Sequence, residues 1–233
     1  MTYAMSDIHG EYEKYRAMLE KIRFSPEDTL FVLGDVVDRG PQPVEVLRDM
    51  MARDNVYPIM GNHEIITLAM LDKLLVEITE ENCETHIDAK LMEHLLDWQM
   101  NGGISTIEGF QALDSDARAD LLDYMRDFAP CEAVDVGERT FVLVHSGLQN
   151  FDERRPLRSY RIEELVQGRH DVHRQYYADP AIHIVRGHTP TPLITGEARI
   201  YREANNICID CGAGFPAGRL ACICLDTLEE FYV

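Results

Sequence analysis

The sequence is short of basic residues and of long apolar runs. Its 233 residues include 22 Lys and Arg against 41 Asp and Glu, which gives a formal net charge of −19. A nucleic-acid or anionic-membrane surface needs a basic face, so we expect neither kind of partner. If the protein handles an anionic substrate, positive charge must be concentrated at one site, and metal ions are the obvious way to supply it.

The cysteine count and the lack of long apolar runs are equally informative. Six cysteines in a chain of this length favour reduced thiols over a disulfide framework. No apolar run approaches the roughly 20 residues of a membrane span. The first residues do not resemble a secretion signal, because Asp7, His9, Glu11 and Glu13 follow a very short apolar stretch. Together these features predict a cytoplasmic protein.

Hydrophobic patterning predicts an α/β chain. Short runs rich in β-branched and aromatic residues predict five buried strands, at Tyr3–Met5, Thr29–Leu33, Val56–Met60, Phe141–Val144 and Ile182–Val185. Later strands are predicted at Ile200–Arg202, Ile207–Asp210 and Leu220–Leu225. Apolar residues at helical spacing predict a helix after each of the first three strands, the third from His63 to Leu75. This alternation is typical of an α/β sandwich.

The stretch from about residue 74 to 128 is predicted to be mostly helical and peripheral. It contains apolar stripes at Leu91–Trp98 and Leu121–Met125. Strands on both sides of this stretch carry residues suited to one site. We therefore expect residues 1–233 to form a single domain with a helical insertion at about 74–128.

Polar side chains follow all five strands, at the point where each strand ends. The residues are Asp7 and His9, then Asp35, Asp38 and Arg39, then Asn62 and His63, then His145, and finally His188. The carboxyl ends of strands in α/β proteins are where ligands bind, because the loops converge there. Five polar clusters at equivalent positions therefore predict one shared site.

The residue types fit a pair of divalent ions. Asp7 and His9, two apart in an extended chain, can grip one ion with an oxygen and a nitrogen. Asp35 can bridge both ions with its two carboxylate oxygens. A neutral oxygen and two imidazoles, from Asn62, His145 and His188, suit the second ion. Mixed oxygen and nitrogen ligands favour Mn, Fe or Zn over Ca or Mg.

Two such ions can carry the chemistry of phosphate hydrolysis. They lower the pKa of a bridging water, which generates hydroxide, and they clamp the attacked phosphorus. His63 follows a proposed ligand directly, so it can donate a proton to the leaving group, and Asp38 can hold its imidazole. Arg39 can chelate two phosphate oxygens with its planar fork.

These motifs resemble the phosphoprotein phosphatase branch of the calcineurin-like metallophosphoesterases. Ser6–Gly10 resembles the family's G-D-x-H-G with serine for the first glycine, Gly34–Gly40 its G-D-x-V-D-R-G, and Gly61–Glu64 its G-N-H-E; His145 and Arg186–Thr189 complete the order. The resemblance implies a four-layer αββα sandwich, two mixed sheets flanked by helices. It also implies a binuclear centre of the Mn type, with His63 as general acid and Asp38 as its partner.

Within that branch the chain resembles the compact bacterial and phage-lambda type. Trp98, Asn101–Gly103 and Thr106 resemble the W-x-x-N-G-G segment of that group, and Ile209–Ala213 resembles its I-D-T-G-A. The group carries a second phosphate-binding arginine in an L-L-W-x-R stretch. The nearest match in this sequence lacks the tryptophan but ends at Arg169. The resemblance therefore implies that Arg169 is the second phosphate contact.

The resemblance implies a metal-dependent phosphomonoesterase that acts on phosphoserine or phosphothreonine in proteins, or on small phosphoesters. The alternative is a symmetrical hydrolase of dinucleoside polyphosphates such as diadenosine tetraphosphate. The Asp38–Arg39 pair and Glu64 favour the protein phosphatase. A thiol oxidoreductase built on Cys208 and Cys211 is disfavoured, because these residues are expected to be small buried hydrophobes.

Overall fold

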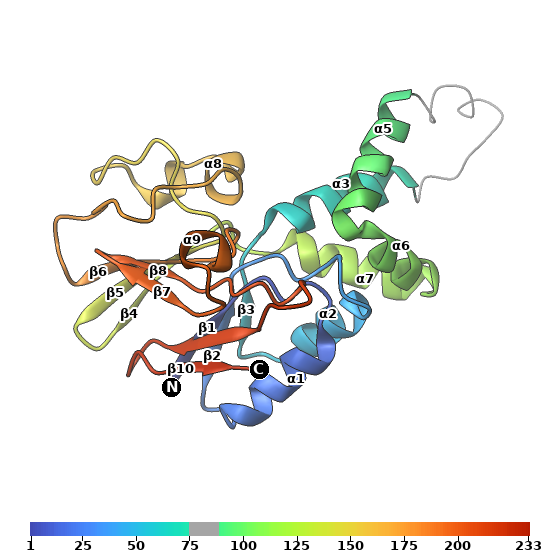
Figure 1. Ribbon diagram of the computed structural model, residues 1–233. Helices are drawn as coiled ribbons and strands as arrows, with labels where there is room; N and C mark the ends of the chain where they lie inside the picture. Colours follow the sequence, from blue (N-terminus) through green and yellow to red (C-terminus); the bar gives the residue numbers. More distant parts are fainter. Residues whose placement is uncertain (75–88) are drawn as a thin grey trace.

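The computed structural model describes residues 1–74 and 89–233 (Figure 1). Residues 75–88, which belong to the predicted insertion, lie outside the described part. Ten strands form two five-stranded sheets within it. The first sheet has the order β10-β9-β1-β2-β3 and the second β4-β5-β6-β8-β7. Each sheet has three parallel strands, β1–β2–β3 or β5–β6–β8, with antiparallel partners at one or both sides, so both sheets are mixed.

The strands are short, as the sequence predicts. Those of the first sheet are β1 (Thr2–Met5), β2 (Thr29–Val32), β3 (Val56–Pro58), β9 (Ala221–Cys224) and β10 (Glu230–Tyr232). Those of the second are β4 (Glu132–Val136), β5 (Arg139–Val144), β6 (Ile182–Arg186), β7 (Tyr201–Glu203) and β8 (Asn206–Cys208). The patterning missed β4 and β10, which are edge strands that carry acidic residues. It also placed the end of β8 two residues too late, at Asp210.

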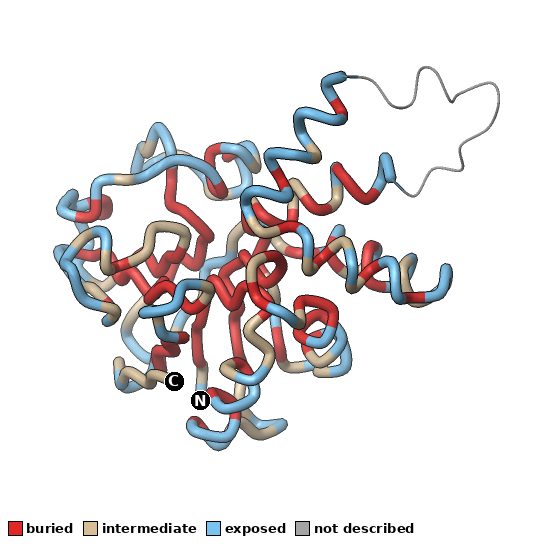
Figure 2. Tube along the Cα trace, turned by 45° about the vertical axis from the view of Figure 1, so that its right-hand side comes forward, coloured by how far each residue is buried: buried red, intermediate tan, exposed pale blue. Residues whose placement is uncertain are grey.

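The two sheets pack face to face, and helices cover their outer faces. Alternate residues of β1 and β2 divide between two cores: Ala4 and Phe31 lie in the core between the sheets, whereas Met5 and Leu30 lie in the core under the helices. Strands β5 and β6 divide in the same way, which explains why their sequences are apolar throughout. Figure 2 shows these strands as the buried centre of the molecule. The fold is the predicted αββα sandwich.

Helices α1 (Tyr12–Lys21) and α2 (Pro43–Met51) pack on the first sheet, and α8 (Ile162–Val166) packs on the second. Two shorter turns, η2 (Leu157–Ser159) and α9 (Pro192–Thr195), belong to the loops of the second sheet. A helical arm extends from the first sheet (Figure 1). It consists of α3 (Asn62–Leu74), α5 (Ala89–Trp98), the π-helical turn η1 (Gln99–Gly103), α6 (Ile104–Gln111) and α7 (Ser115–Arg126).

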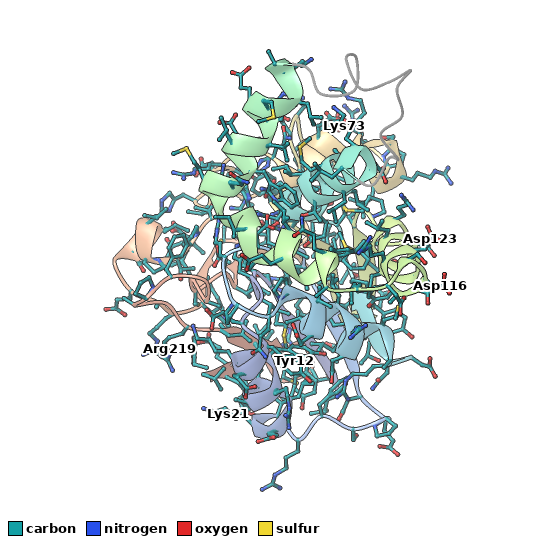
Figure 3. All side chains as sticks on the ribbon, turned by 90° about the vertical axis from the view of Figure 1, so that its right-hand side faces the viewer. Tyr12, Lys21, Lys73, Asp116, Asp123 and Arg219 are labelled. Carbon is teal, nitrogen blue, oxygen red and sulfur yellow. The ribbon has the colours of Figure 1, made fainter. Side chains whose placement is uncertain are left out.

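The described part of the predicted insertion is therefore helical. Acidic side chains such as Asp116 and Asp123 project from the outer side of α7 (Figure 3). In residues 1–74 and 89–233, no helix combines the length and the apolar character that a membrane crossing requires.

Candidate metal centre

The carboxyl ends of β1, β2 and β3 in one sheet and of β5 and β6 in the other meet at one edge of the sandwich. Hydrogen bonds join the two sheets there. The His188 backbone N–H donates to the Asp7 carboxylate at 3.0 Å, although the two residues are 181 positions apart. The His145 Nδ1–H donates to the Leu33 carbonyl oxygen at 2.8 Å. The structure thus brings together polar residues from all five predicted strand ends.

Asp35 lies at the centre of this edge. Its carboxylate belongs to two groups of side chains whose ligand atoms all lie within 4.8 Å of one another, one with His9 and His63 and the other with His145 and His188. Its Oδ2 is 3.8 Å from His9 Nε2, and its Oδ1 is 3.4 Å from His145 Nε2. Burial alone would raise the pKa of Asp35, but the imidazoles of His145, His63 and His9 hold it well below its usual range.

The donor set around His145 fits a metal ion. His145 donates its Nδ1–H to the Leu33 carbonyl, which directs Nε2 towards the other side chains of the site. That nitrogen lies 2.9 Å from Asn62 Oδ1 and 3.4 Å from Asp35 Oδ1. An imidazole nitrogen and two side-chain oxygens that converge in this way are suitable ligands for a divalent cation. A neighbouring backbone carbonyl that fixes the imidazole in this way is typical of metal-ligating histidines.

His9 and His188 are also suited to act as metal ligands. The His9 Nδ1–H donates to the Val37 carbonyl at 3.0 Å, so the Nε2 lone pair faces the site, where it accepts a hydrogen bond from Arg39 Nη1. Burial lowers the pKa of His9 to about 3 and, with the nearby His145, lowers that of His188 to about 4. Both imidazoles are therefore neutral at pH 7, as metal ligation requires.

The backbone at Asp7 and His9 differs from the sequence-based expectation. The two residues were expected to lie in extended chain and to point the same way. Both instead have positive φ, 52° and 48°. Asp7 faces the second sheet, where it accepts the His188 N–H, and it belongs to neither group of clustered ligand atoms around Asp35. Its burial and the nearby Asp210 and Asp35 carboxylates raise its pKa well above the usual value.

Positive φ recurs along the whole edge. Asp35, Asp38, Arg39 and His188 also have φ between 53° and 68°. Non-glycine residues rarely adopt this region, and such strain clusters at functional sites where the surrounding fold enforces it. Here the enforcing contacts include Glu64, whose buried carboxylate accepts the backbone N–H groups of Asp35, Val36, Val37 and Gly61.

His63 and Asp38 form a buried pair beside Asp35. His63 Nδ1 lies 2.7 Å from Asp38 Oδ2, so the carboxylate orients the ring and leaves Nε2 directed towards the site. Burial lowers the pKa of His63, but the charge of Asp35 and the hydrogen bond and charge of Asp38 outweigh it, so the net pKa lies above the usual value. A raised pKa favours the protonated imidazole, which is the form that can donate a proton.

The helical arm holds Asp38 in place. Asp38 Oδ2 accepts the Trp98 Nε1–H at 3.0 Å, and its Oδ1 accepts the Thr106 hydroxyl at 2.6 Å. Thr106 Oγ1 in turn accepts the Asp38 backbone N–H at 3.0 Å. All three side chains are buried. Sequence reasoning noted Trp98 and Thr106 as part of a motif but assigned them no partner.

Replacing Thr106 with valine is expected to lower the free energy of unfolding by about 2 kcal/mol, because the isosteric change strands a buried carboxylate oxygen and a buried N–H. Denaturation in urea measures this difference. Ser105→Ala is the matched control, since the buried Ser105 hydroxyl has no hydrogen-bond partner among residues 1–74 and 89–233. Equal stabilities of the two variants would mean that Thr106 does not support Asp38.

Arg39 also lies at the site. Its Nη1 donates to His9 Nε2 at 2.6 Å, its Nη2 lies 3.2 Å from His63 Nε2, and its guanidinium carbon lies 5.0 Å from the centre of the Phe215 ring. The η1 turn fixes its backbone, because the Arg39 N–H donates to the Gly102 carbonyl at 2.9 Å. Gly102 has φ of 101°, and a Cβ there would meet Arg39 Cγ at 2.7 Å.

Arg169 is exposed, in the loop that follows α8. Its charge is close enough to contribute to the lowered pKa of His188, which places it on the second-sheet side of the edge.

Sequence reasoning left Asp210 out of the site. This buried residue follows β8, and burial with the charge of Asp35 raises its pKa to about 7. Its position after another parallel strand was the signal that could have identified it.

The two-sheet sandwich with polar side chains gathered at this edge is the architecture of a phosphoesterase domain. The chain belongs to the calcineurin-like phosphoesterase family, which matches residues 2–212.

Relatives in sequence include the symmetrical bis(5'-nucleosyl)-tetraphosphatase of Erwinia tasmaniensis, 35% identical over 99 residues, and that of Escherichia coli K12, 34% identical over 99 residues. These matches cover 42% of this chain and 36% and 35% of the respective relatives, so the similarity spans about a third of the relatives' length.

Similar solved structures share the fold. A crystal structure provisionally described as a diadenosine tetraphosphatase superposes with a TM-score of 0.66 at 18% identity, over 100% of this chain and 92% of the other. A cold-active protein tyrosine phosphatase superposes with a TM-score of 0.54 at 15% identity, over 99% and 78% of the two chains.

Proposed function

We propose that this protein hydrolyses symmetrical dinucleoside tetraphosphates to two nucleoside diphosphates, with two divalent cations, Mn in preference to Fe or Zn. The observation that supports the hydrolytic part is the convergence of candidate ligand atoms on Asp35, beside the protonatable His63. The sequence similarity to symmetrical tetraphosphatases supports the choice of substrate.

The ligands of this proposal divide between the two sheets. Asp7, His9 and Asp35 of the first sheet would hold one ion, and Asp35, Asn62, His145 and His188 the other. Bound ions would supply the positive charge that attracts a phosphate chain in an otherwise acidic protein and that activates water for attack on phosphorus.

Residues of the chain itself bind the phosphates and donate the proton. Arg39 binds phosphate oxygens with its fork, on release from His9. Arg169 reaches the phosphate chain from the second-sheet side. His63, held by Asp38, donates the proton of Nε2 to the oxygen that leaves phosphorus. A water oxygen forms the new P–O bond, the bond between the two central phosphates breaks, and each half leaves as a nucleoside diphosphate.

A phosphoprotein phosphatase is the second candidate, and the Asp38–Arg39 pair favours it. Glu64, which the sequence also offered in its favour, is buried and accepts hydrogen bonds from backbone N–H groups of the site. The similarity to a protein tyrosine phosphatase is one of fold.

One experiment separates the two candidates. The purified protein with Mn²⁺ is given diadenosine tetraphosphate or a phosphoserine peptide, and the products are resolved by anion exchange. We expect ADP as the sole nucleotide product and a kcat/KM at least about a hundredfold higher than for the peptide, a difference of about 2.7 kcal/mol. The reverse preference, or release of AMP and ATP, would contradict the proposal.

Metal removal is expected to destabilise the protein. Ions that bind the folded state alone add stability through mass action, about 2.7 kcal/mol per site at a concentration 100 times the Kd. Chelation with EDTA should therefore lower the melting temperature, and added Mn²⁺ should restore it. Calorimetric scans of both states measure the shift. Coincident scans would show that no ion of significant affinity binds.

A further inference from the structure

An apolar pocket lies next to the candidate metal centre, on the side of α9. It has a volume of about 350 Å³, within the range of small-molecule sites. One wall comes from the segment after His188, with Pro190, Pro192, Leu193 and Ala198. The other comes from the loop after Asp210, with Phe215 and Ala217. Both walls therefore begin at strand ends of the metal centre.

Phe215 connects this pocket to the phosphate side of the site. Its ring lines the pocket, and the Arg39 guanidinium lies 5.0 Å from the ring centre on the way to His9 and His63. Gly214, the residue before it, packs so closely that a Cβ there would lie 3.0 Å from His9 Cβ. A ligand that contacts Arg39 with a phosphate can thus reach the pocket with its adjoining group.

The chemistry of the pocket selects an uncharged group. None of the residues that line it is charged, in a protein with a net charge of −19. Arg219, which follows the loop, lies at the outer edge of the molecule (Figure 3), with its guanidinium carbon 4.4 Å from the centre of the Tyr232 ring. Leu193 and Phe215 are nevertheless 66% and 46% exposed, so the pocket presents apolar surface to solvent. Such a surface beside a polar centre indicates a binding site.

The pocket is also formed in advance. The Phe215 N–H donates to the Gly212 carbonyl and the Gly218 N–H to the Phe215 carbonyl, both at 2.9 Å. The Thr191 N–H donates to the Asp210 carbonyl at 2.8 Å, which ties the two walls together. A flat, rigid group can therefore enter without the loop having to order first.

We propose that this pocket binds one nucleobase of the substrate, with the attached phosphates running past Arg39 to the metal centre. The inference rests on the proposed function. A dinucleoside polyphosphate joins a highly charged chain to uncharged aromatic bases, and the two adjacent environments match these two parts. Every base has a π-face that can pack on an aromatic ring, so the contact with Phe215 is suited to bases in general.

Calorimetric titration of the Mn²⁺-loaded protein tests the assignment. The two ligands are ADP and ribose 5-diphosphate, which carries the same charge but no base. We expect the wild type to bind ADP about tenfold more tightly or better, as stacking of one base provides. Ala217→Trp, which fills the pocket, and Leu193→Gln, which makes its wall polar, should bring the two dissociation constants within about threefold of each other.

Leu96→Gln is the matched control, because Leu96 is 56% exposed on α5 and undergoes the same change outside the pocket. It should keep the wild-type preference. Equal binding of both ligands by the wild type would overturn the proposal, and so would a full preference in Ala217→Trp. If the two pocket variants weakened only a phosphopeptide with an apolar flanking residue, the pocket would be a peptide site and the proposal would be wrong.

Hydrolysis of diadenosine tetraphosphate is measured on the same samples. This measurement tests the proposed reaction, whereas the titration tests the pocket assignment. Hydrolysis without any preference for ADP would overturn the pocket assignment alone. A preference for ADP without hydrolysis would support the pocket and overturn the proposed reaction.

Discussion

Asp35→Asn is expected to lower kcat/KM by about a thousandfold or more and to release bound metal. Asp35 is the one carboxylate common to both groups of ligand atoms, and an amide offers only one ligand oxygen in place of two. The imidazoles that now hold the pKa of Asp35 low would also lose their shared counter-charge. Metal content by mass spectrometry and steady-state kinetics with diadenosine tetraphosphate measure the two effects.

The control for Asp35→Asn is Asp123→Asn, which removes the same charge from the exposed side of α7, where Asp123 pairs with Arg126. This variant should keep its metal and its activity. If Asp35→Asn bound two equivalents of metal and kept more than a tenth of wild-type kcat/KM, a bridging role for Asp35 would be excluded.

The second large effect is expected from His63→Asn. Loss of a general acid lowers kcat by about 100- to 1,000-fold, and the loss grows as the leaving group becomes a poorer one. An alkyl phosphate, whose leaving oxygen needs the proton most, should therefore suffer more than a dinucleotide that releases a phosphate group. A series of aryl and alkyl phosphates with rising leaving-group pKa, assayed on both proteins, measures this dependence.

The same variant distinguishes two roles for His63, since its ring also clusters with His9 and Asp35. If His63 is the general acid, its replacement should leave the metal content unchanged. If it is a metal ligand, its replacement should lower the metal content. His173→Asn, on an exposed histidine paired with Glu203, is the control for the loss of an imidazole. An equal loss of kcat across the whole leaving-group series would contradict the assignment of His63 as the acid.

Much of the fold and of the site's location could be predicted because both follow from short-range patterns. Buried parallel strands are apolar throughout, and their carboxyl ends are polar where loops meet, so Asp35, His145 and His188 could be placed together from their positions at predicted strand ends. The two missed strands, β4 and β10, lie at sheet edges, where one side faces solvent and acidic residues interrupt the apolar run.

Contacts made by the helical arm could not be predicted in this way. Thr106 meets Asp38 across 68 positions, and Trp98 meets it across 60, because the arm docks on the loop after β2. No local pattern encodes that docking. The orientation of Asp7 differs from the prediction because the chain at Asp7 and His9 has positive φ, whereas the prediction assumes an extended chain.

The arrangement of the centre across two sheets has a consequence for how the protein matures. Its residues come from the first strand of one sheet and from β6 of the other, and Asp7 meets His188 only when both sheets have packed. A molecule in which only one sheet has folded would therefore hold only part of the proposed ligand set, and metal binding would depend on the packing of the two sheets.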